Sequence, residues 1–407
     1  MRVLKNLANL EKIIAKKRKR KKQIREQVAR ILKEVKEKGE EVVLKYTQRF
    51  DKVKLKPKEL RVTESEISAA FNELNSQIIS AIKTAIESVY GFHKALLPKP
   101  FLKIKKEDGK ILGIKYVPLR RVGIYVPAGS APLVSSVYMC AIPAQTAGVK
   151  EIVLVSPPTK DKSINPFILA TASLLKIKEI YKIGGAQAIA VLAYGTRTIK
   201  KVDKIIGPGN EYVMEAKKQV FGEVDIDLLA GPSEVLIIAS KNANLDYILS
   251  DLEAQAEHYK GLVMVVTTSK KIANNLRKKK LNGFVVRVRN LEEAVKVANI
   301  IAPEHVEIFT KNPTTLLKKI ENAGAVFLGE NTPVALGDYL AGPSHVLPTH
   351  GTAKFFSGLS VKDFLKEIHF VSYSKKALEK QFPALLEIAS LEGMKKHIES
   401  VEKRLNR

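Results

Sequence analysis

The sequence contains one cysteine and no tryptophan among its 407 residues. An intrachain disulfide is therefore excluded, and Cys140, which lies among apolar residues in an expected helix, is interpreted as a buried structural thiol. Long apolar runs are also missing, and charged residues interrupt the N-terminus. Because neither a membrane span nor a signal peptide is expected from such a pattern, we predict a cytoplasmic protein.

Acidic residues are the minority charge, with 42 Asp and Glu against 69 Lys and Arg and a formal net charge of +27. The basic run 16–22 precedes an amphipathic helical pattern at 24–35. A solvated basic arm and an arm that binds RNA or an anionic surface both fit this run. No aromatic residues interleave with it to stack on bases, so nucleic-acid binding is not expected. Attraction of an anionic cofactor is a milder consequence of the charge.

The 407 residues exceed the size at which one hydrophobic core stops growing, so two or more domains are expected. Short apolar runs alternate with helical patterns, which predicts parallel sheets covered on both faces. We therefore predict an α/β fold with two Rossmann-like doubly wound parallel-sheet domains, a helical N-terminal arm and a small helical C-terminal tail. The expected strands are residues 123–126, 152–155, 180–183, 205–206, 235–239, 263–267, 285–288, 306–309 and 325–328.

The G-x-G-x-x-G fingerprint of dinucleotide binding is absent from every strand-to-helix turn. Three glycine-bearing turns follow expected strands instead: PAGS (127–130), GGAQ (184–187) and GPGN (207–210). Glycine allows the backbone to approach a phosphate or sugar closely where the strand order of a sheet reverses. Ordinary tight turns would use the same residues, so both interpretations stay open at this point.

Six of the seven histidines fall between His258 and His397. Four of them lie in short polar motifs: AQAEH (254–258), APEH (302–305), ALGDYLAGPSH (335–345) and EGMKKH (392–397). A neutral imidazole coordinates first-row metals, and its charge changes near neutral pH. Such a group of motifs is therefore typical of a metal site or an acid/base site.

The first motif follows residues at helical spacing, so Gln255 and His258 project to one side near a helix end. They would form half of a metal site, although a histidine at this place also satisfies the last helix carbonyls. In the second motif, Glu304 and His305 lie on a helix-to-strand connection, where catalytic groups are often held. A solvated polar turn is the alternative there.

The third motif places Asp338 and His345 in a loop punctuated by glycine and proline, among apolar residues rather than among Lys and Glu. Apolar lining with a few polar groups is typical of a ligand pocket. The fourth motif, with Glu392 and His397, lies in a Lys-rich terminal helix. Taken by itself, it indicates a surface charge pattern.

Together and in this order, the four motifs resemble the histidinol dehydrogenase family of zinc enzymes. The resemblance covers nearly the whole chain, from about Gln23 to about His397. It implies a basic helical arm at 1–22, a first Rossmann-like domain on the metal and substrate side from 23–122 and 234–358, a second on the NAD side at 123–233, and a C-terminal helical tail used in dimerisation at 359–407. The further matching strings are RRVGIYVPAGSAPLVSSVYM (120–139), GGAQAIAVLAYGT (184–196), KVDKIIGPGNEYVMEAKKQV (201–220), AGPSEVLIIA (230–239), AGAVFLG (323–329) and SGLSVKDF (357–364).

The resemblance also assigns roles to residues of this chain. The catalytic acid/base pair would be Glu304 and His305. The zinc ligands, which also contact substrate, would be Gln255, His258, Asp338 and His397. The remaining substrate contacts would be Ser233, His305, His345 and Glu392, and the NAD contacts Tyr125, Gln187 and Asn210.

The implied activity is the four-electron oxidation of L-histidinol to L-histidine, the final steps of L-histidine biosynthesis. Two hydrides would pass to NAD through enzyme-held histidinal, and one zinc per subunit would orient the substrate. His305 would act as general base, and Glu304 would activate the water that attacks the aldehyde. A homodimer is implied as well, because Glu392 and His397 would be donated across the interface.

Two departures from the family pattern stand out. After AQAEH the family continues with glycine, whereas Tyr259 and Lys260 precede Gly261 here. The segment after His397 is short, basic and dissimilar. Two other classes of function remain as alternatives: a zinc-dependent hydrolase, which would not need the glycine turns, and a nonenzymatic RNA-binding paralogue, which would be expected to have lost part of the polar constellation.

Overall fold

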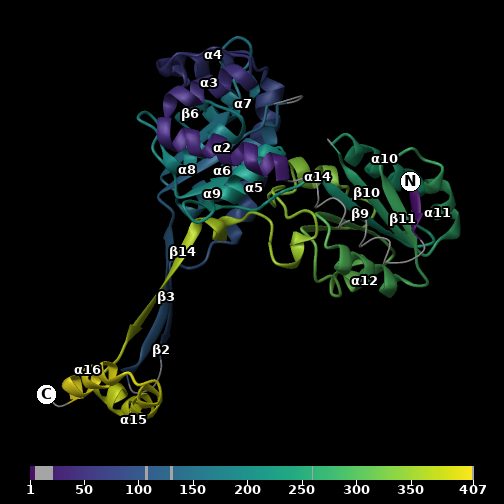
Figure 1. Ribbon diagram of the computed structural model, residues 1–407. Coiled ribbons are helices and arrows are strands. Elements are labelled where there is room, and N and C mark those ends of the chain that lie inside the picture. The colour runs from purple at the N-terminus through teal and green to yellow at the C-terminus, as the bar shows by residue number, and fades with distance from the viewer. Residues whose placement is uncertain (5–21, 106–108, 129–131, 259, 406–407) are drawn as a thin grey trace. The chain divides into compact units, whose positions relative to one another are not determined.

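The computed structural model describes residues 1–4, 22–105, 109–128, 132–258 and 260–405 (Figure 1). The chain divides into two compact units. The first comprises Met1–Leu96 and Arg120–Phe364, and the second comprises Leu97–Leu119 and Leu365–Arg407. None of the helices in the described ranges combines the length and the apolar character that a bilayer crossing requires.

The first unit contains a six-stranded parallel sheet in the order β1-β11-β10-β9-β12-β13. Runs such as EVLIIA and LVMVVT are apolar at every position but the first or last, because both faces of this sheet are buried. One face packs on α12 (Leu291–Ile301) and the other on α10 (Leu245–Ala256) and α11 (Lys270–Arg277) (Figure 1). The strands are β1 (Arg2–Leu4), β9 (Glu234–Ala239), β10 (Leu262–Thr267), β11 (Gly283–Arg287), β12 (His305–Phe309) and β13 (Ala325–Leu328).

The first unit also contains a five-stranded parallel sheet in the order β6-β5-β4-β7-β8. Its order reverses between β4 and β7, which defines a topological switch point. The strands are β4 (Arg121–Tyr125), β5 (Glu151–Ser156), β6 (Glu179–Lys182), β7 (Lys204–Ile206) and β8 (Asp225–Ile226), and the connecting helices are α6 (Val134–Ala147), α7 (Pro166–Leu174), α8 (Gly185–Tyr194) and α9 (Glu211–Val220). The predicted α/β class with two parallel sheets is confirmed.

The N-terminal helices pack on this second sheet. Apolar residues of α2 (Lys22–Lys38) and α3 (Glu40–Phe50) share one core with Val155 and Ile183. The contacts therefore differ from the expected grouping of 23–122 with 234–358. In the expected helical arm, residues 2–4 form strand β1 instead, because they add a parallel edge to β11. All of the basic run except Lys22, the first residue of α2, lies outside the described residues.

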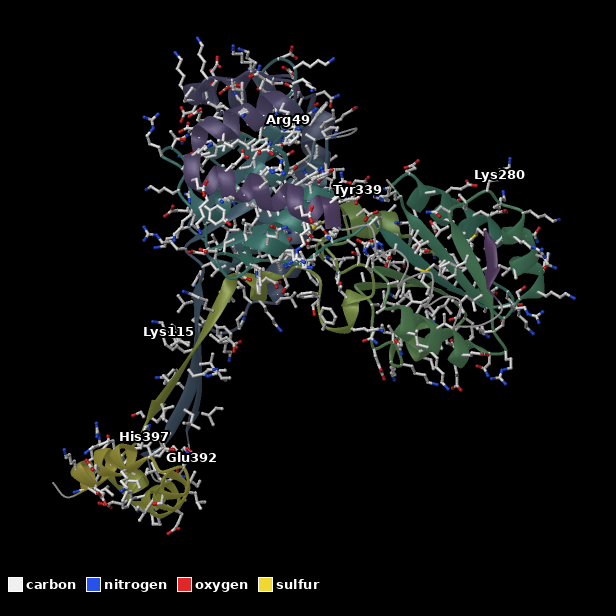
Figure 2. The ribbon with its side chains drawn as sticks, in the orientation of Figure 1. Arg49, Lys115, Lys280, Tyr339, Glu392 and His397 are labelled. Carbon is white, nitrogen blue, oxygen red and sulfur yellow. The ribbon has the colours of Figure 1, made fainter. Side chains whose placement is uncertain are left out.

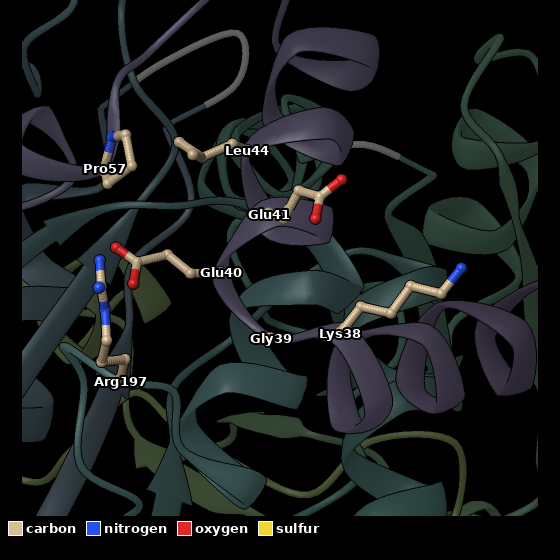
Figure 3. A pocket seen from close by; sticks show the side chains of 7 residues that line it. All are labelled: Lys38, Gly39, Glu40, Glu41, Leu44, Pro57 and Arg197. Carbon is tan, nitrogen blue, oxygen red and sulfur yellow. The ribbon is translucent and has the colours of Figure 1, made fainter.

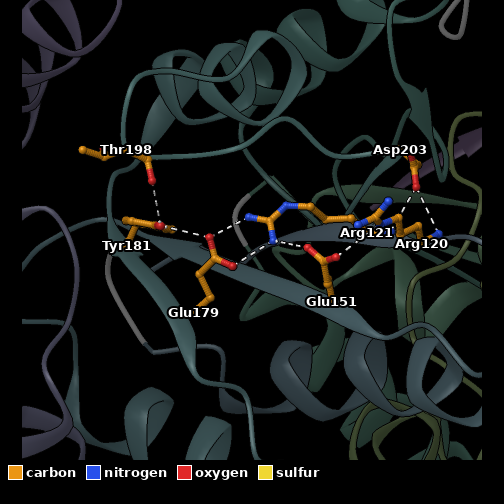
Figure 4. A network of polar contacts seen from close by, with 7 residues as sticks. All are labelled: Arg120, Arg121, Glu151, Glu179, Tyr181, Thr198 and Asp203. Atoms are coloured by element: carbon orange, nitrogen blue, oxygen red, sulfur yellow. Dashed lines mark hydrogen bonds and ion pairs between the residues drawn. The ribbon is translucent and has the colours of Figure 1, made fainter.

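A polar network joins the amino ends of β4, β5 and β6 (Figure 4). The Arg121 guanidinium donates to Glu151 at 2.9 Å and to both oxygens of Glu179 at 2.8 and 2.6 Å. The Tyr181 hydroxyl donates to Glu179 at 2.9 Å. Asp203 accepts the backbone N–H of Arg121 at 3.0 Å. These contacts tie the starts of neighbouring strands together.

The second unit is built on a three-stranded antiparallel sheet in the order β14-β3-β2. The expected C-terminal tail is therefore helical only in part, since Leu365–Ser372 pairs with β3 along its whole length. Several apolar side chains of this unit are exposed, including Phe101, Val371 and Leu391. Its elements are β2 (Phe101–Lys105), β3 (Ile111–Pro118), β14 (Leu365–Ser372), α15 (Lys375–Leu391) and α16 (Lys395–Leu405). The remaining helices, α4 (Glu64–Asn72), α5 (Ser76–Ala95), α13 (Pro313–Leu317) and α14 (Val334–Tyr339), belong to the first unit.

Candidate functional site

The predicted acid/base pair lies where α12 gives way to β12. The helix ends at Ala302 in a left-handed conformation, with a φ of 50°, and Pro303 prevents its continuation. Glu304 follows, and His305 opens the strand beside Val235 of β9. The pair therefore occupies the amino ends of parallel strands, the opposite edge from the one that ligands commonly use in open α/β sheets.

Glu304 is buried and anchored by two donors. One carboxylate oxygen accepts the Ser233 hydroxyl at 2.5 Å and the backbone N–H of Glu234 at 2.9 Å. Burial raises the pKa of Glu304 to about 7, although these hydrogen bonds act in the opposite direction. A carboxyl group with a pKa near the working pH exchanges protons readily, which suits general acid/base catalysis.

His305 is also buried, and its two ring nitrogens have different environments. Nδ1 lies 3.1 Å from the Glu234 carbonyl. Because a carbonyl oxygen only accepts, Nδ1 carries the proton and Nε2 carries a lone pair. Nε2 has no hydrogen-bond partner in the described part of the chain and lies 4.0 Å from the Asp338 carboxylate. Burial lowers the pKa of His305 to about 4, so its ring is a neutral base at neutral pH.

Glu234 was not recognised from the sequence, yet it contacts both members of the pair. Its N–H binds Glu304 and its carbonyl binds His305. Both contacts use backbone groups, which every residue except proline offers, so no residue type could reveal them. The one visible signal was an acidic residue at the start of an otherwise apolar buried strand.

The third motif folds as α14 and a loop that returns to it. The His345 Nδ1–H donates to the Asp338 carbonyl at 3.0 Å, and Nε2 lies 3.4 Å from the Ser136 hydroxyl of α6. Burial lowers the pKa of His345 to about 4. Burial raises the pKa of Asp338, whereas the nearby imidazoles of His305 and His258 lower it. The predicted residues Glu304, His305, Asp338 and His345 thus belong to one neighbourhood.

The first motif lies at the end of α10. Gln255 is buried, and its Nε2 has no hydrogen-bond partner among the described residues. His258 is exposed just beyond the helix and acts electrostatically on both Glu304 and Asp338. The sequence departs from the family pattern directly after His258. There Lys260 has a φ of 59°, and the Gly261 N–H donates to the His258 carbonyl at 2.8 Å.

The described residues contain no group of three or more His, Cys, Asp or Glu side chains arranged to hold a metal. The set of Gln255, His258 and Asp338 still fits zinc in its donor chemistry, since it offers an amide, an imidazole and a carboxylate. The unpartnered Gln255 atom is the amide nitrogen, which only donates, so the fit rests on the donor set and not on this atom.

Glu392 and His397 belong to the second unit (Figure 2). Glu392 caps the C-terminus of α15, and His397 lies in the first turn of α16. Both side chains are exposed. Their predicted roles at the substrate and the metal stay predictions.

The three predicted NAD contacts lie at the carboxyl ends of the second parallel sheet. Tyr125 ends β4, and its buried hydroxyl accepts the Gly185 N–H at 3.1 Å. Gln187 is fully buried near the start of α8, and neither atom of its amide has a partner in the described ranges. Asn210 is exposed and caps α9 by accepting from Tyr212 at 3.0 Å. Two of these positions, after β4 and after β7, flank the switch point where dinucleotides bind in such sheets.

The turn after β7 requires glycine. Gly207 has a φ of 112°, and a Cβ there would lie 2.2 Å from the Tyr125 carbonyl oxygen. Close packing within the chain therefore requires Gly207, which an ordinary tight turn also explains, and the NAD contacts stay predictions. In the turn at 127–130, residues 129 and 130 lie outside the described residues.

A separate surface cavity of about 400 Å³ lies at the junction of α2 and α3 (Figure 3). It is lined by Lys38, Gly39, Glu40, Glu41, Leu44, Pro57 and Arg197. None of the residues predicted from the sequence as site residues lines it. The predicted acid/base pair therefore lies outside this cavity.

Comparison with known proteins identifies the family of the chain. The family model for histidinol dehydrogenase matches residues 14–405. A histidinol dehydrogenase of Clostridium acetobutylicum is 44% identical over 393 residues, which cover 92% of this chain and 90% of that protein. One from Methanocaldococcus jannaschii is 43% identical over 412 residues, covering 97% and 96%. The crystal structure of histidinol dehydrogenase from Elizabethkingia anophelis aligns with a TM-score of 0.88 at 36% identity, over 100% of this chain and 94% of that one.

Proposed function

The chain belongs to the histidinol dehydrogenase family, and we propose that it oxidises L-histidinol to L-histidine with zinc and two NAD, the final steps of L-histidine biosynthesis. As a family member it is an oxidoreductase that acts on an alcohol or aldehyde. The hydrolase alternative loses its support for this reason. The observation that carries the proposal is the buried pair of Glu304 and His305, held through Glu234 with the lone pair of His305 Nε2 unpartnered among the described residues.

His305 supplies the general base of both oxidation steps. In the first step its Nε2 takes the proton of the substrate hydroxyl, and NAD, when bound, would accept the hydride from the same carbon. The Glu234 carbonyl stabilises the imidazolium that forms, because it already accepts the Nδ1–H at 3.1 Å. Removing the proton in this way is typically worth about 10²–10⁴ in rate.

Glu304 serves the second step. The aldehyde must be hydrated before it can lose another hydride, and a carboxylate can take a proton from the attacking water. The pKa of Glu304, raised by burial to about 7, leaves a substantial carboxylate fraction at neutral pH. His305, after it has released the first proton to water, then accepts a proton from the hydrate as the second hydride leaves.

Gln255, His258 and Asp338 would hold the zinc, with His397 of a second copy as the fourth ligand. When bound, zinc supplies ligation of the substrate nitrogens and so fixes the orientation of the reacting carbon. Ser233, His345 and the second copy's Glu392 would complete the substrate contacts. Tyr125, Gln187 and Asn210 would bind NAD at the switch point. This arrangement requires a homodimer, for which we propose a cytoplasmic location.

Counting NADH tests the proposal. Zinc-loaded protein is incubated with limiting histidinol and excess NAD, and the NADH formed per histidinol consumed is measured. We expect a ratio of two, and NADH formation about 10⁴-fold slower from His305→Asn. A ratio of one would limit the enzyme to a single oxidation step, and no NADH from folded, zinc-loaded wild type would overturn the proposal.

A further inference from the structure

Strand β12 carries an acidic residue where its neighbours are apolar. His305, Glu307 and Phe309 point to one face, because side chains alternate along a strand. Phe309 on that face belongs to the core formed with α10 and α14. Glu307 pairs in register with Ile237 and has no exposed surface. A buried carboxyl group in such a core conflicts with its surroundings, and conflicts of this kind are expected at functional positions.

Among the described residues, the Glu307 side chain makes one hydrogen bond, and its partner belongs to another element. One carboxyl oxygen accepts the N–H of Val334 at 3.0 Å, and the other has no partner in the described part of the chain. Val334 is the first residue of α14, and the N–H groups of a first helical turn have no partner within the helix. Pro333, at the capping position, offers no side-chain acceptor. Glu307 therefore caps α14 from the neighbouring strand.

The C-terminal end of α14 is held by the Tyr138 hydroxyl, which donates to the Tyr339 carbonyl at 3.0 Å, whereas Glu307 holds its first turn. Val334 is its one buried residue. The other end of this six-residue helix carries Asp338, whose carboxylate lies 4.0 Å from His305 Nε2 and whose carbonyl accepts from His345. A shift of the first turn would therefore move Asp338 relative to His305.

The protonation state of Glu307 fits this use. Burial, reinforced by the neighbouring carboxyl group of Asp251 on α10, raises the pKa of Glu307 to about 8. At neutral pH the buried group is a neutral acid, which avoids the cost of an isolated buried charge. A neutral acid still accepts the Val334 N–H through its carbonyl oxygen. Glutamine would accept in the same way, whereas leucine would not.

We propose that Glu307 is a positioning residue, whose carboxyl group docks the first turn of α14 on β12 and so sets the distance between Asp338 and His305. The inference rests on the proposed function, which gives Asp338 and His305 their roles. Glu307 itself touches neither substrate nor cofactor. It acts through α14.

Two variants separate this role from general stability. Glu307→Leu removes the acceptor, and Glu307→Gln keeps it. For Glu307→Leu we expect kcat to fall about 100-fold, as displacement of a site group by about 1 Å does, and zinc affinity, measured by chelator competition, to fall about 10-fold or more. The free energy of unfolding should stay level or rise, because apolar replacement of a buried polar group often stabilises. Glu307→Gln should resemble the wild type in all three.

The hydrogen-exchange rate of the Val334 amide in zinc-free protein measures its contact with Glu307 directly. Exchange should be about tenfold faster in Glu307→Leu, the effect of one lost hydrogen bond, and unchanged in Glu307→Gln. The proposal would be overturned if the Val334 amide of Glu307→Leu exchanged at the wild-type rate. It would also be overturned if exchange were faster while kcat and zinc affinity were unaltered. If the wild type failed to oxidise histidinol, the proposed function would fall, while exchange and zinc affinity would still test the positioning role.

Discussion

The two parallel sheets treat polar groups at their amino ends in opposite ways. At the start of β4, β5 and β6, Arg121 donates three hydrogen bonds to Glu151 and Glu179 (Figure 4). At the start of β9 and β12, His305 keeps a buried Nε2 without a partner among the described residues. Similar geometry thus serves two purposes. The partnered groups of Arg121 hold strands together, although its Nε has no partner in the described ranges, whereas we propose that the unpartnered His305 Nε2 is left for a proton.

The largest expected effect is at His305. Replacing it by Asn should lower kcat by about 10⁴, the upper end of what a general base contributes, because an amide cannot accept the proton. Stability should change little. Steady-state kinetics with histidinol measure the loss, and His369→Asn, at an exposed position on β14, is the control. If the kcat of His305→Asn lay within tenfold of the wild-type value, the contrast drawn between the amino ends of the two sheets would be wrong.

The opposite pattern is expected at Arg121. Its side chain is only 8% exposed, so Arg121→Leu leaves Glu179 without its main partner and should cost about 3 kcal/mol of unfolding free energy. The kcat of the surviving folded protein should be unchanged. Urea denaturation measures the change in the free energy of unfolding. Arg120→Leu is the matched control, since Arg120 is 85% exposed and its ion pair is worth less than about 1 kcal/mol.

A change at Glu304 should separate the two half-reactions. We predict that Glu304→Gln slows aldehyde oxidation by about 100-fold and alcohol oxidation much less, because only the aldehyde step needs an activated water. Single-turnover measurements starting from histidinol and from histidinal compare the two steps. Equal losses in both would contradict the role assigned to Glu304.

The smallest effect concerns His93, a buried unpartnered group outside the candidate site. Burial lowers its pKa to about 4, and neither ring nitrogen has a partner in the described ranges. Because the pKa of His93 is lower in the folded state than in the unfolded state, the folded protein keeps its full stability above the unfolded pKa of about 6.5. It loses unfolding free energy as the pH falls toward 4. His93→Phe should therefore shift the midpoint of acid unfolding to lower pH and leave kcat unchanged. A large loss of kcat would show that the unpartnered ring nitrogens of His93 on α5 also serve the reaction.

The sequence was most informative where burial is complete. The apolar runs at 235–239 and 263–267 predicted β9 and β10, because strands buried on both faces are apolar at nearly every position. Spacing of chemistry-bearing residues likewise pointed to Glu304 and His305. The positions of these residues in the structure agree with those inferences, and their catalytic roles stay predictions.

The sequence did not predict several tertiary contacts. The packing of α2 on the second sheet depends on which of two apolar surfaces accepts it, and an amphipathic pattern does not name its partner. Strand β14 has mostly exposed residues, so the sequence predicts a helical tail where the structure has a strand. Glu234 contacts the acid/base pair through its backbone, and Glu307 accepts the N–H of Val334 on another element. Neither contact produces a recognisable sequence motif.

The most direct test of the account is the state of the His305 ring. Nitrogen NMR of histidine-labelled, zinc-free protein reports protonation at each ring nitrogen, and the signal missing from His305→Asn assigns it. The account predicts a neutral ring from pH 6 to 8 with the proton on Nδ1, since the pKa of His305 is lowered to about 4. A ring charged at pH 7, or one with its proton on Nε2, would contradict the claim that the unpartnered nitrogen is the base.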